Sequence, residues 1–307
     1  MKGPITPAPA IRPEPTRFRL QGRSASLDRR IHAARPDLAD IALAGTLFSA
    51  HYARAVEFTC VAAGAPVLAA PAATARAVSE LLRGESFHAL DVTTDWAWGF
   101  CGHDAYVGYV RREALDTREE ATHRVTAHPA PLFREPDIKA PITDYWPRGA
   151  RFAGDLLSTG DGPMFIATAE GFIHYRHAAD ADLRESDWVT VARRYLGLPY
   201  VWGGRGHRGI DCSGLVQVAL SQCGIAVPRD TDLQRDGIGV PVAAHSRLRK
   251  GDFVFFPGHV GIMADDDHLL HANAHWMAVV VEPLADVVAR LTPGHDTPII
   301  ARRRIGS

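Results

Sequence analysis

The stretch GIDCSGLVQVAL, residues 209–220, holds one cysteine between an aspartate and a serine, immediately before a run that is apolar almost all round. The run continues to Cys223 and is followed by Gly224, a residue type that commonly ends helices. A helix that is apolar around most of its circumference is buried. Residues 212–223 are therefore predicted to form the central helix of a domain, with Cys212 in its first turn.

The start of that helix suggests a chemical role for the thiol. The first turn of a helix presents unpaired backbone N–H groups and the positive end of the helix dipole. This environment is expected to lower the pKa of the Cys212 thiol, and the thiolate is the nucleophilic form. A buried structural cysteine is the alternative, because free cysteines are among the most buried residues. The polar neighbours Asp211 and Ser213 favour the nucleophile, and we interpret Cys60, Cys101 and Cys223 as structural.

The segments around the central helix predict the class of the domain. Trp188, Val191, Ala192 and Tyr195 follow the spacing of one buried helix face, which predicts a helix over 187–196 that ends at Gly197. Four strand candidates follow the central helix, at residues 252–256, 259–263, 268–271 and 278–282. Helices followed by antiparallel strands indicate an α+β domain.

A nucleophilic thiol needs a general base, and His259 opens a strand directly after the turn at Pro257-Gly258. If the second and third strand candidates pair symmetrically about Asp266, Gly261 faces His271. His259 is then the diagonal neighbour of His271 on the same face of the sheet. A slip of one residue would place the two histidines on opposite faces, so their contact depends on the register. In the predicted register, His271 is placed to orient His259.

An internal repeat precedes this domain. Ala65–Leu68 aligns with Ala130–Phe133, Arg83–Phe87 aligns with Arg148–Phe152, and after a short slip residues 108–110 meet residues 171–173. Short alternating segments separated by Gly, Asp and Pro predict two small antiparallel β-barrels. The predicted domain limits are 1–60 for an N-terminal extension that starts as a proline-rich arm, 61–117 and 118–180 for the barrels, and 181–307 for the C-terminal domain.

Composition excludes few partners, but it favours none that are highly charged. The 307 residues carry a formal net charge of -1, so there is no electrostatic reason to expect nucleic acid or an anionic membrane surface as a partner. The first twenty residues lack the apolar core of a signal peptide, and no run of about 18 apolar residues marks a membrane span. We expect a cytoplasmic protein, with an exported form left open, and predict no oligomeric state.

Six ordered sequence blocks across about residues 185–300 resemble the NlpC/P60 peptidases. These blocks are Tyr200–Gly204, Asp211–Leu215, Pro228–Thr231 with Gln234, Leu248–Phe256, His259–Ile262 and His271-Ala272. The two predicted barrels resemble bacterial SH3 domains. The whole chain thus resembles the γ-D-glutamyl-L-diamino acid endopeptidases that cut peptidoglycan stem peptides, which implies an α+β fold with a papain-like catalytic domain after two SH3-like β-barrels.

The resemblance also implies roles for single residues. Cys212 would be the nucleophile, His259 the general base and His271 the group that orients the base. Tyr200 matches the family's active-site tyrosine and would help backbone N–H groups near Cys212 to stabilise the oxyanion. Four positions match residues that line the family's substrate groove: Asp211, Ser213, Asp230 and Thr231. The implied substrate is a peptidoglycan-derived peptide cut between γ-D-glutamate and diaminopimelate or lysine, with no cofactor.

The two copies of the repeat differ at positions that bear on specificity. The first copy has Glu85 and Tyr109 where the second has Ala150 and Phe172, so the polar groups occur in the first copy alone. In related multidomain enzymes the first SH3-like domain accepts the free amine of an N-terminal L-alanine. The resemblance therefore predicts Glu85 as the amine acceptor, with Tyr106 or Tyr109 supplying a hydroxyl or a ring, in an enzyme of murein peptide recycling. The alternative is that these are ordinary surface and edge residues.

Three other functions compete with this interpretation. A papain-like fold also suits an amidase or acyltransferase with another acyl substrate, and SH3-like modules suit a non-catalytic protein that binds cell-wall peptides. His271 and His275 have the spacing of a helical metal pair near His268, but no adjacent glutamate completes the zinc motif, so no metal is predicted. The complete set of Cys212, His259 and His271 favours an enzyme over a binding protein.

Overall fold

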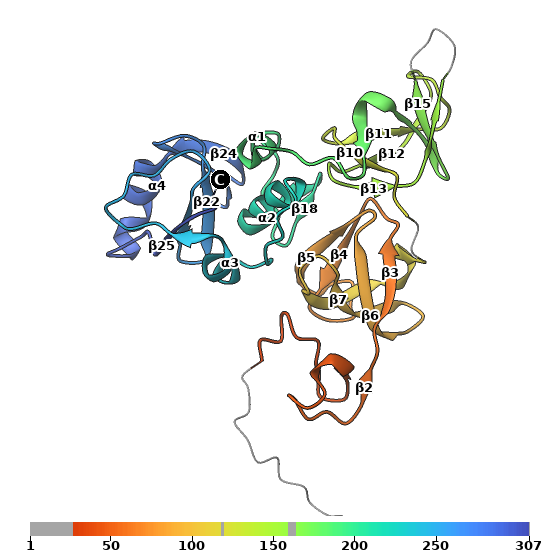
Figure 1. The fold of residues 1–307 in the computed structure, drawn as a ribbon, viewed down its shortest axis with the longest axis horizontal. Coiled ribbons are helices and arrows are strands. Elements are labelled where there is room, and N and C mark those ends of the chain that lie inside the picture. The colour runs from red at the N-terminus through yellow and green to blue at the C-terminus, as the bar shows by residue number, and fades with distance from the viewer. Residues whose placement is uncertain (1–26, 118–119, 159–163, 307) are drawn as a thin grey trace, which may run out of the picture.

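The computed structural model describes residues 27–117, 120–158 and 164–306, and the predicted proline-rich arm lies outside these ranges. Figure 1 shows two β-rich regions, coloured orange to yellow and yellow to green, beside a C-terminal domain coloured teal to blue. The first β-rich region lies between the N-terminal segment and the second one. That segment contains β1 (Ala39–Asp40), η1 (Ile41–Leu43) and β2 (Tyr52–Ala53), and β1 pairs with β2 in parallel.

The first β-rich region is one antiparallel sheet of seven strands in the order β5-β4-β8-β7-β6-β3-β9. Its core consists of alternating inward-facing side chains such as Val67, Leu81 and Phe87, as expected for strands with one buried face. The elements are β3 (Val56–Cys60), β4 (Gly64–Leu68), β5 (Ala77–Leu82), β6 (Ser86–Val92), β7 (Trp96–Cys101), β8 (Val107–Arg111), η2 (Arg112–Ala114) and β9 (Leu115–Asp116). Strand β3 precedes the predicted domain limit at residue 61 and pairs with β6 and β9.

The second β-rich region contains a five-stranded sheet, β12-β11-β16-β15-β14, and a three-stranded sheet, β13-β10-β17. Its core is built around the buried Trp146, with Leu132 and Ile173 packed in the same cluster. The elements are β10 (His123–Val125), β11 (Ala130–Phe133), β12 (Ile142–Trp146), β13 (Arg151–Phe152), β14 (Asp155–Leu157), β15 (Phe165–Thr168), β16 (Gly171–His174), η3 (Tyr175–His177) and β17 (Ala178–Asp180).

The predicted repeat is confirmed at the level of strand pairing. In both copies the first aligned strand, β4 or β11, pairs with the next strand and has a register irregularity at the equivalent position, Val67/Leu68 or Leu132/Phe133. Leu68 pairs with Tyr109, as Phe133 pairs with Phe172. The aligned turn glycines at positions 84 and 149 both have a positive φ, which side chains with a Cβ rarely adopt. The region is thus SH3-type and β-rich, while closure into two barrels and the four domain limits stay predictions.

The C-terminal domain packs a buried helix against a six-stranded antiparallel sheet in the order β20-β25-β21-β22-β23-β24. The helix is α2, and it begins at Cys212 and ends just before Gly224, as predicted. Figure 1 shows α2 beside the sheet. The elements are α1 (Trp188–Arg193), β18 (Arg205–Gly206), β19 (Gly209–Ile210), α2 (Cys212–Gln222), α3 (Thr231–Gly237), β20 (Val240–Pro241), β21 (Phe253–Phe256), β22 (His259–Met263), β23 (His268–Asn273), β24 (Ala278–Pro283), α4 (Leu284–Leu291), η4 (Thr292–Gly294) and β25 (Ala301–Arg304).

The four strand candidates are confirmed as β21, β22, β23 and β24, and α1 is shorter than the predicted helix. Asp187 starts α1 by accepting a hydrogen bond from the Val189 N–H, and Gly197 follows with a φ of 81°. The architecture is α+β, with the β-rich region N-terminal to the helices and sheet. Among the described residues, no helix is long and apolar enough to cross a membrane.

Candidate active site

Cys212 is the first residue of α2 and is 6% exposed at the floor of a cavity. The predicted decrease of its thiol pKa is wrong. Burial raises the pKa of the Cys212 thiol, and the neighbouring charge of Asp211 raises it further. Hydrogen bonds from Thr231 and from the Val260 backbone oppose this effect without overcoming it. The positive field at the helix start has a smaller effect on the thiol pKa than the loss of water around the sulfur. Cys212 is therefore a neutral thiol at rest.

The predicted contact between the two histidines is confirmed. Strand β22 pairs with β23 through Ile262 and Leu270, the register in which Gly261 faces His271. His259 and His271 then share one face of the sheet, and Nε2 of His259 lies 2.8 Å from Nδ1 of His271. Hairpin symmetry about Asp266 was therefore sufficient to locate the pair.

The structure adds Glu282, which the sequence interpretation missed. Its Oε1 atom lies 2.9 Å from Nε2 of His271 and also accepts from Arg290, while its Oε2 atom accepts from the Trp276 indole. Strand β24 pairs Val280 with His271, so Glu282 is the diagonal neighbour of His271 on the same face. A charged residue at the end of the apolar run 278–281 was the signal that could have identified it.

Nε2 of His271 lies 2.9 Å from the Glu282 carboxylate and 3.0 Å from the Asn273 amide nitrogen, and we assign its proton by the negative charge of Glu282. Because a carboxylate only accepts, His271 donates Nε2–H to Glu282, and its Nδ1 atom then accepts the Nε2–H of His259. Nδ1 of His259 is left with a lone pair, as a general base requires. Burial, and next the positive charge of a protonated His271, lower the pKa of His259 to about 3, which keeps its imidazole neutral near pH 7.

Strand β22, which carries this base, packs against the helix that carries the thiol. Val260 directly follows His259, and its backbone N–H is directed at the Cys212 sulfur, where it acts to lower the thiol pKa. Helix α2 and strand β22 pack together in the same core cluster, which contains both Cys212 and Val260. A neutral thiol can react with a neutral imidazole by transferring its proton to the base as the sulfur attacks.

Asp211 and Ser213 flank the nucleophile, and their polar atoms are largely used inside the protein. Asp211 caps α2 by accepting from the Gly214 N–H at 2.8 Å and also forms a buried ion pair with Arg229 at 2.6 Å. Arg229 additionally donates to the Ser213 hydroxyl at 2.8 Å. The main role of Asp211 is therefore to fix the start of α2. The role of Arg229 was missed because nothing in the sequence distinguishes a buried arginine from an exposed one.

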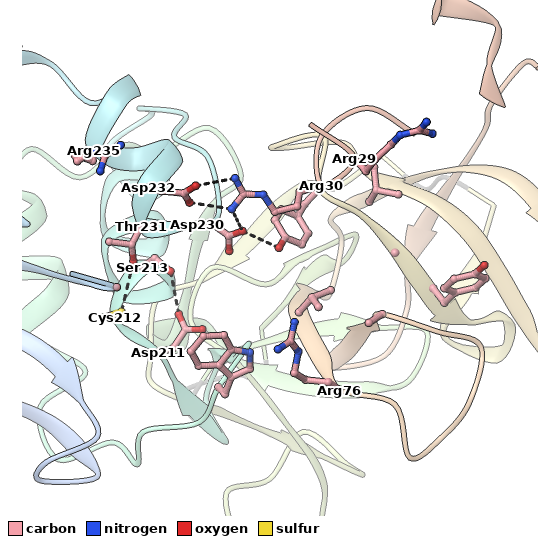
Figure 2. A pocket seen from close by; sticks show the side chains of 18 of the residues that line it. Arg29, Arg30, Arg76, Asp211, Cys212, Ser213, Asp230, Thr231, Asp232 and Arg235 are labelled. Carbon is pink, nitrogen blue, oxygen red and sulfur yellow. Dashed lines mark hydrogen bonds and ion pairs between the residues drawn. The ribbon is translucent and has the colours of Figure 1, made fainter. Parts of the chain in front are cut away.

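The cavity above Cys212 measures about 710 Å³ and is formed by the C-terminal domain, the first β-rich region and the N-terminal segment. Tyr200, Asp230 and Thr231 of the C-terminal domain line it, together with Tyr106 and Tyr109 of the first β-rich region. Figure 2 shows Thr231 directed toward Cys212, and its hydroxyl lies 3.8 Å from the sulfur. The structure thus brings ten of the eleven predicted site residues to this cavity or to the base behind it.

Tyr106 and Asp230 meet across the boundary between the two domains. The Tyr106 hydroxyl donates to Oδ2 of Asp230 at 2.9 Å. Burial and the Asp230 charge raise the pKa of Tyr106, so it stays a hydrogen-bond donor. Burial, and next the negative charge that Cys212 carries when it ionises, likewise raise the pKa of Tyr200, which keeps its hydroxyl protonated.

The expectation for Glu85 is wrong. Arg205 of the C-terminal domain, 1% exposed, donates to both carboxylate oxygens of Glu85 at 2.7 and 2.9 Å. Burial opposes ionisation, but Arg205 and His103 hold the pKa of Glu85 below its usual value. Glu85 lines a different cavity of about 400 Å³, away from Cys212. Its difference from Ala150 therefore reflects an ion pair that joins two domains, which no comparison of the repeats could distinguish from a ligand site.

The histidines considered for a metal site do not come together. His271 lies on strand β23, so it cannot pair with His275 across a helical turn, and His268 contacts Asp265 instead. Within residues 27–117, 120–158 and 164–306, no group of three or more His, Cys, Asp or Glu side chains has the arrangement of a metal site.

Comparison with known proteins agrees with this geometry. Residues 197–289 match the NlpC/P60 family, and residues 67–115 match the bacterial dipeptidyl-peptidase SH3 domain. Dipeptidyl-peptidase 6 of Lysinibacillus sphaericus is 27% identical over 235 residues, which cover 69% of this chain and 86% of that protein. The γ-D-glutamyl-L-lysine dipeptidyl-peptidase of Bacillus cereus is 32% identical over 127 residues, covering 38% of this chain and 35% of that protein.

A solved structure supports the fold independently. The crystal structure of an NlpC/P60 family protein from Bacillus cereus superimposes with a TM-score of 0.66 at 21% identity, over 81% of this chain and 99% of that one. The two family matches and the thiol, imidazole and carboxylate geometry lead to one conclusion. Residues 197–289 thus form an NlpC/P60 domain with the side chains of a cysteine peptidase, and a bacterial SH3 domain precedes it in the chain.

Proposed function

We propose that this peptidase hydrolyses the bond between γ-D-glutamate and the following diamino acid, diaminopimelate or lysine, in peptidoglycan-derived peptides that carry a free N-terminal L-alanine. The observation that carries the proposal is the cavity itself. It has the nucleophile Cys212 at its floor and the carboxylate of Asp230 on its wall. The name of the relative from Bacillus cereus, a γ-D-glutamyl-L-lysine dipeptidyl-peptidase, supplies the substrate class.

The chemistry begins with proton transfer from Cys212 to Nδ1 of His259 as the sulfur attacks the γ-carbonyl carbon of D-glutamate. Cys212 and Ser213 are the first two residues of α2, so their N–H groups have no intrahelical acceptor and suit the developing oxyanion. The Tyr200 hydroxyl is a further donor beside the sulfur. The His259 imidazolium then protonates the leaving amine, and water releases L-Ala-D-Glu from the thioester.

Charges on the cavity wall suit the two charged groups of an L-Ala-γ-D-Glu unit. Its free amine needs an acceptor, and the pair Asp230 and Tyr106 provides a carboxylate held in place by a hydroxyl. Its D-glutamate carries an α-carboxylate that is not part of the scissile bond. Arg76 lines the cavity and has no carboxylate partner in the described part of the chain, so it is our candidate for that anion. Murein peptide recycling is the process that such a substrate would serve.

The test is mass spectrometry of the products from L-Ala-γ-D-Glu-meso-diaminopimelate and from its N-acetylated copy. Release of L-Ala-D-Glu from the free-amine peptide, and not from the acetylated one, supports the bond and the amine requirement together. Cys212→Ala should release no product from either. Equal cleavage of both peptides would contradict the amine requirement but support the assignment of the scissile bond. Cleavage of neither peptide would favour an amidase or acyltransferase with another acyl substrate, or a binding protein.

A further inference from the structure

The N-terminal segment extends to the wall of the catalytic cavity. The backbone carbonyl of Arg30 accepts a hydrogen bond from the Val107 N–H at 2.7 Å, which attaches the segment to strand β8 of the SH3 domain. Asp28 accepts from Arg30 through both carboxylate oxygens and fixes the direction of its side chain. The guanidinium of Arg30 is thereby placed at the cavity, which it lines together with residues of the catalytic domain.

Arg30 contacts two carboxylates of the catalytic domain. Its Nη1 atom donates to Oδ2 of Asp230 at 2.8 Å, and its Nη2 atom donates to Oδ2 of Asp232 at 2.7 Å. Figure 2 shows the guanidinium directed between these two side chains. Charge-assisted bonds of this kind are directional, so they fix the orientation of the carboxylates they bind. Arg30 therefore connects the N-terminal segment to the cavity wall across the domain boundary.

The two donors to Asp230 use the same oxygen. Arg30 and Tyr106 both bind Oδ2, and the Asp230 side chain does not cap helix α3 although it directly precedes it. In the part of the chain that the structure describes, Oδ1 of Asp230 makes no hydrogen bond. One oxygen of this carboxylate is thus held from two sides while the other remains available for a ligand.

The four charged groups that contact one another here still carry a net negative charge. Three carboxylates, of Asp28, Asp230 and Asp232, surround the single guanidinium of Arg30. The group as a whole is negative, because one positive charge cannot neutralise three negative ones. An ammonium at Oδ1 would bring it closer to neutrality, so Arg30 does not remove the attraction for an amine.

We propose that Arg30 is a positioning residue for substrate specificity: together with Tyr106 it holds the Asp230 carboxylate so that Oδ1 receives the ammonium of the substrate's N-terminal L-alanine. This inference rests on the proposed function and assigns the N-terminal segment a part in it. In the opposite arrangement, Arg30 would occupy the site of the ammonium and obstruct it. The two arrangements predict opposite effects on amine binding. Removal of Arg30 weakens amine binding in the first arrangement and strengthens it in the second.

The experiment measures kcat and KM of the full-length wild type and of Arg30→Gln on the free-amine peptide L-Ala-γ-D-Glu-meso-diaminopimelate, and kcat/KM on its N-acetylated copy. Loss of one charge-assisted contact to Asp230 should raise KM for the free-amine peptide about tenfold. Because Arg30 does not touch the thiol or its base, kcat should change less than twofold. The ratio of kcat/KM between the two peptides should fall, which a general loss of stability would not produce.

Three further variants keep the result interpretable. Arg29→Gln changes the neighbouring arginine, which donates to the Ala34 carbonyl and points away from Asp230 in Figure 2, and should leave the ratio unchanged. Arg30→Lys keeps the charge and should recover part of the KM. Asp232→Asn removes the second anchor of Arg30 and should raise KM by a smaller factor. Asp232→Asn also tests the proposal if Arg30→Gln does not fold.

Each other outcome is decisive. A lower KM for Arg30→Gln would show that the guanidinium obstructs the amine and would overturn the proposal. An unchanged KM, with a wild type that still rejects the acetylated peptide, would overturn it while leaving the proposed function in place. A wild type that cleaves both peptides equally well would remove the amine requirement and this inference with it.

Discussion

The Nε2 atom of His259 lies 2.8 Å from the Nδ1 atom of His271, and this contact determines which nitrogen of His259 can act as the base. His271 can accept at Nδ1 only if it carries its proton on Nε2, where Glu282 accepts it at 2.9 Å. The pair of histidines therefore acts with a third member, a carboxylate on the next strand. Exchange of any one of the three changes the tautomer or the charge that faces Cys212.

The first prediction concerns the nucleophile. Cys212→Ala should abolish peptide cleavage, because Cys212 is the only thiol among the described residues that line the cavity. Cys223 is the matched control: it follows α2 at its other end, and Cys223→Ala should keep wild-type kcat. Cleavage assays before and after iodoacetamide treatment, with both variants, test this assignment. Full activity in Cys212→Ala, or inactivation by iodoacetamide that requires Cys223, would contradict it.

A second prediction concerns Glu282. Glu282→Gln keeps an oxygen that can accept from His271 but loses the negative charge that stabilises a protonated His259–His271 pair. We expect kcat to fall by about an order of magnitude, with KM nearly unchanged. The matched control is Asp265→Asn, which neutralises a carboxylate that contacts the exposed His268 at 3.0 Å. A wild-type kcat in Glu282→Gln would mean that the carboxylate only fixes the ring of His271.

Glu85 supplies a prediction that separates stability from specificity. Glu85→Gln weakens the ion pair with the buried Arg205 and should lower the free energy of unfolding by about 3 kcal/mol. The preference for the free amine should stay as in the wild type, because Glu85 lies in the other cavity. Urea unfolding and the ratio of kcat/KM for the free and acetylated peptides test the two parts. A changed ratio of kcat/KM in a folded variant would instead support a role for Glu85 in binding the amine.

The pH dependence of activity is a fourth prediction. Since the pKa of His259 is lowered to about 3, protonation of the base should not reduce kcat between pH 8 and pH 5. The amine of a free N-terminal residue has a pKa of about 8, and only its protonated form is attracted to Asp230. KM should therefore rise above about pH 8 while kcat stays level. A kcat that halves near pH 6.5 would show that His259 titrates at its ordinary value.

The same lowered pKa predicts how stability depends on pH. The pKa of histidine is 6.5 in the unfolded chain and about 3 for folded His259, so the unfolded state binds the additional proton between these values. The stability present above pH 6.5 should thus decrease as the pH falls toward 3, by up to about 1.4 kcal/mol per pH unit from this group. Urea midpoints of the wild type and His259→Gln should converge at low pH. Parallel curves would contradict the lowered value.

Much of the fold followed from local patterns in the sequence. The apolar circumference of residues 212–223 predicted α2, because a helix without a polar face must be buried. The hairpin between β22 and β23 was also predicted, and the structure has the symmetric register about Asp266 that the sequence offered as one possibility. The repeat was visible because both copies need the same bends and turn glycines. These features could be predicted because they depend on residues that are close to one another in the sequence.

By itself, the sequence determined the α+β class, the repeat, the nucleophile's place on its helix and the two histidines of one hairpin. Tertiary structure alone decided the thiol pKa, the use of Glu85, and the contacts of Asp230 with Tyr106 and Arg30. The physical reason is common to all three: burial and ion pairing depend on groups that fold against a residue from distant parts of the chain. Arg30 and Asp230 are 200 positions apart in the sequence, and no local pattern could reveal their contact.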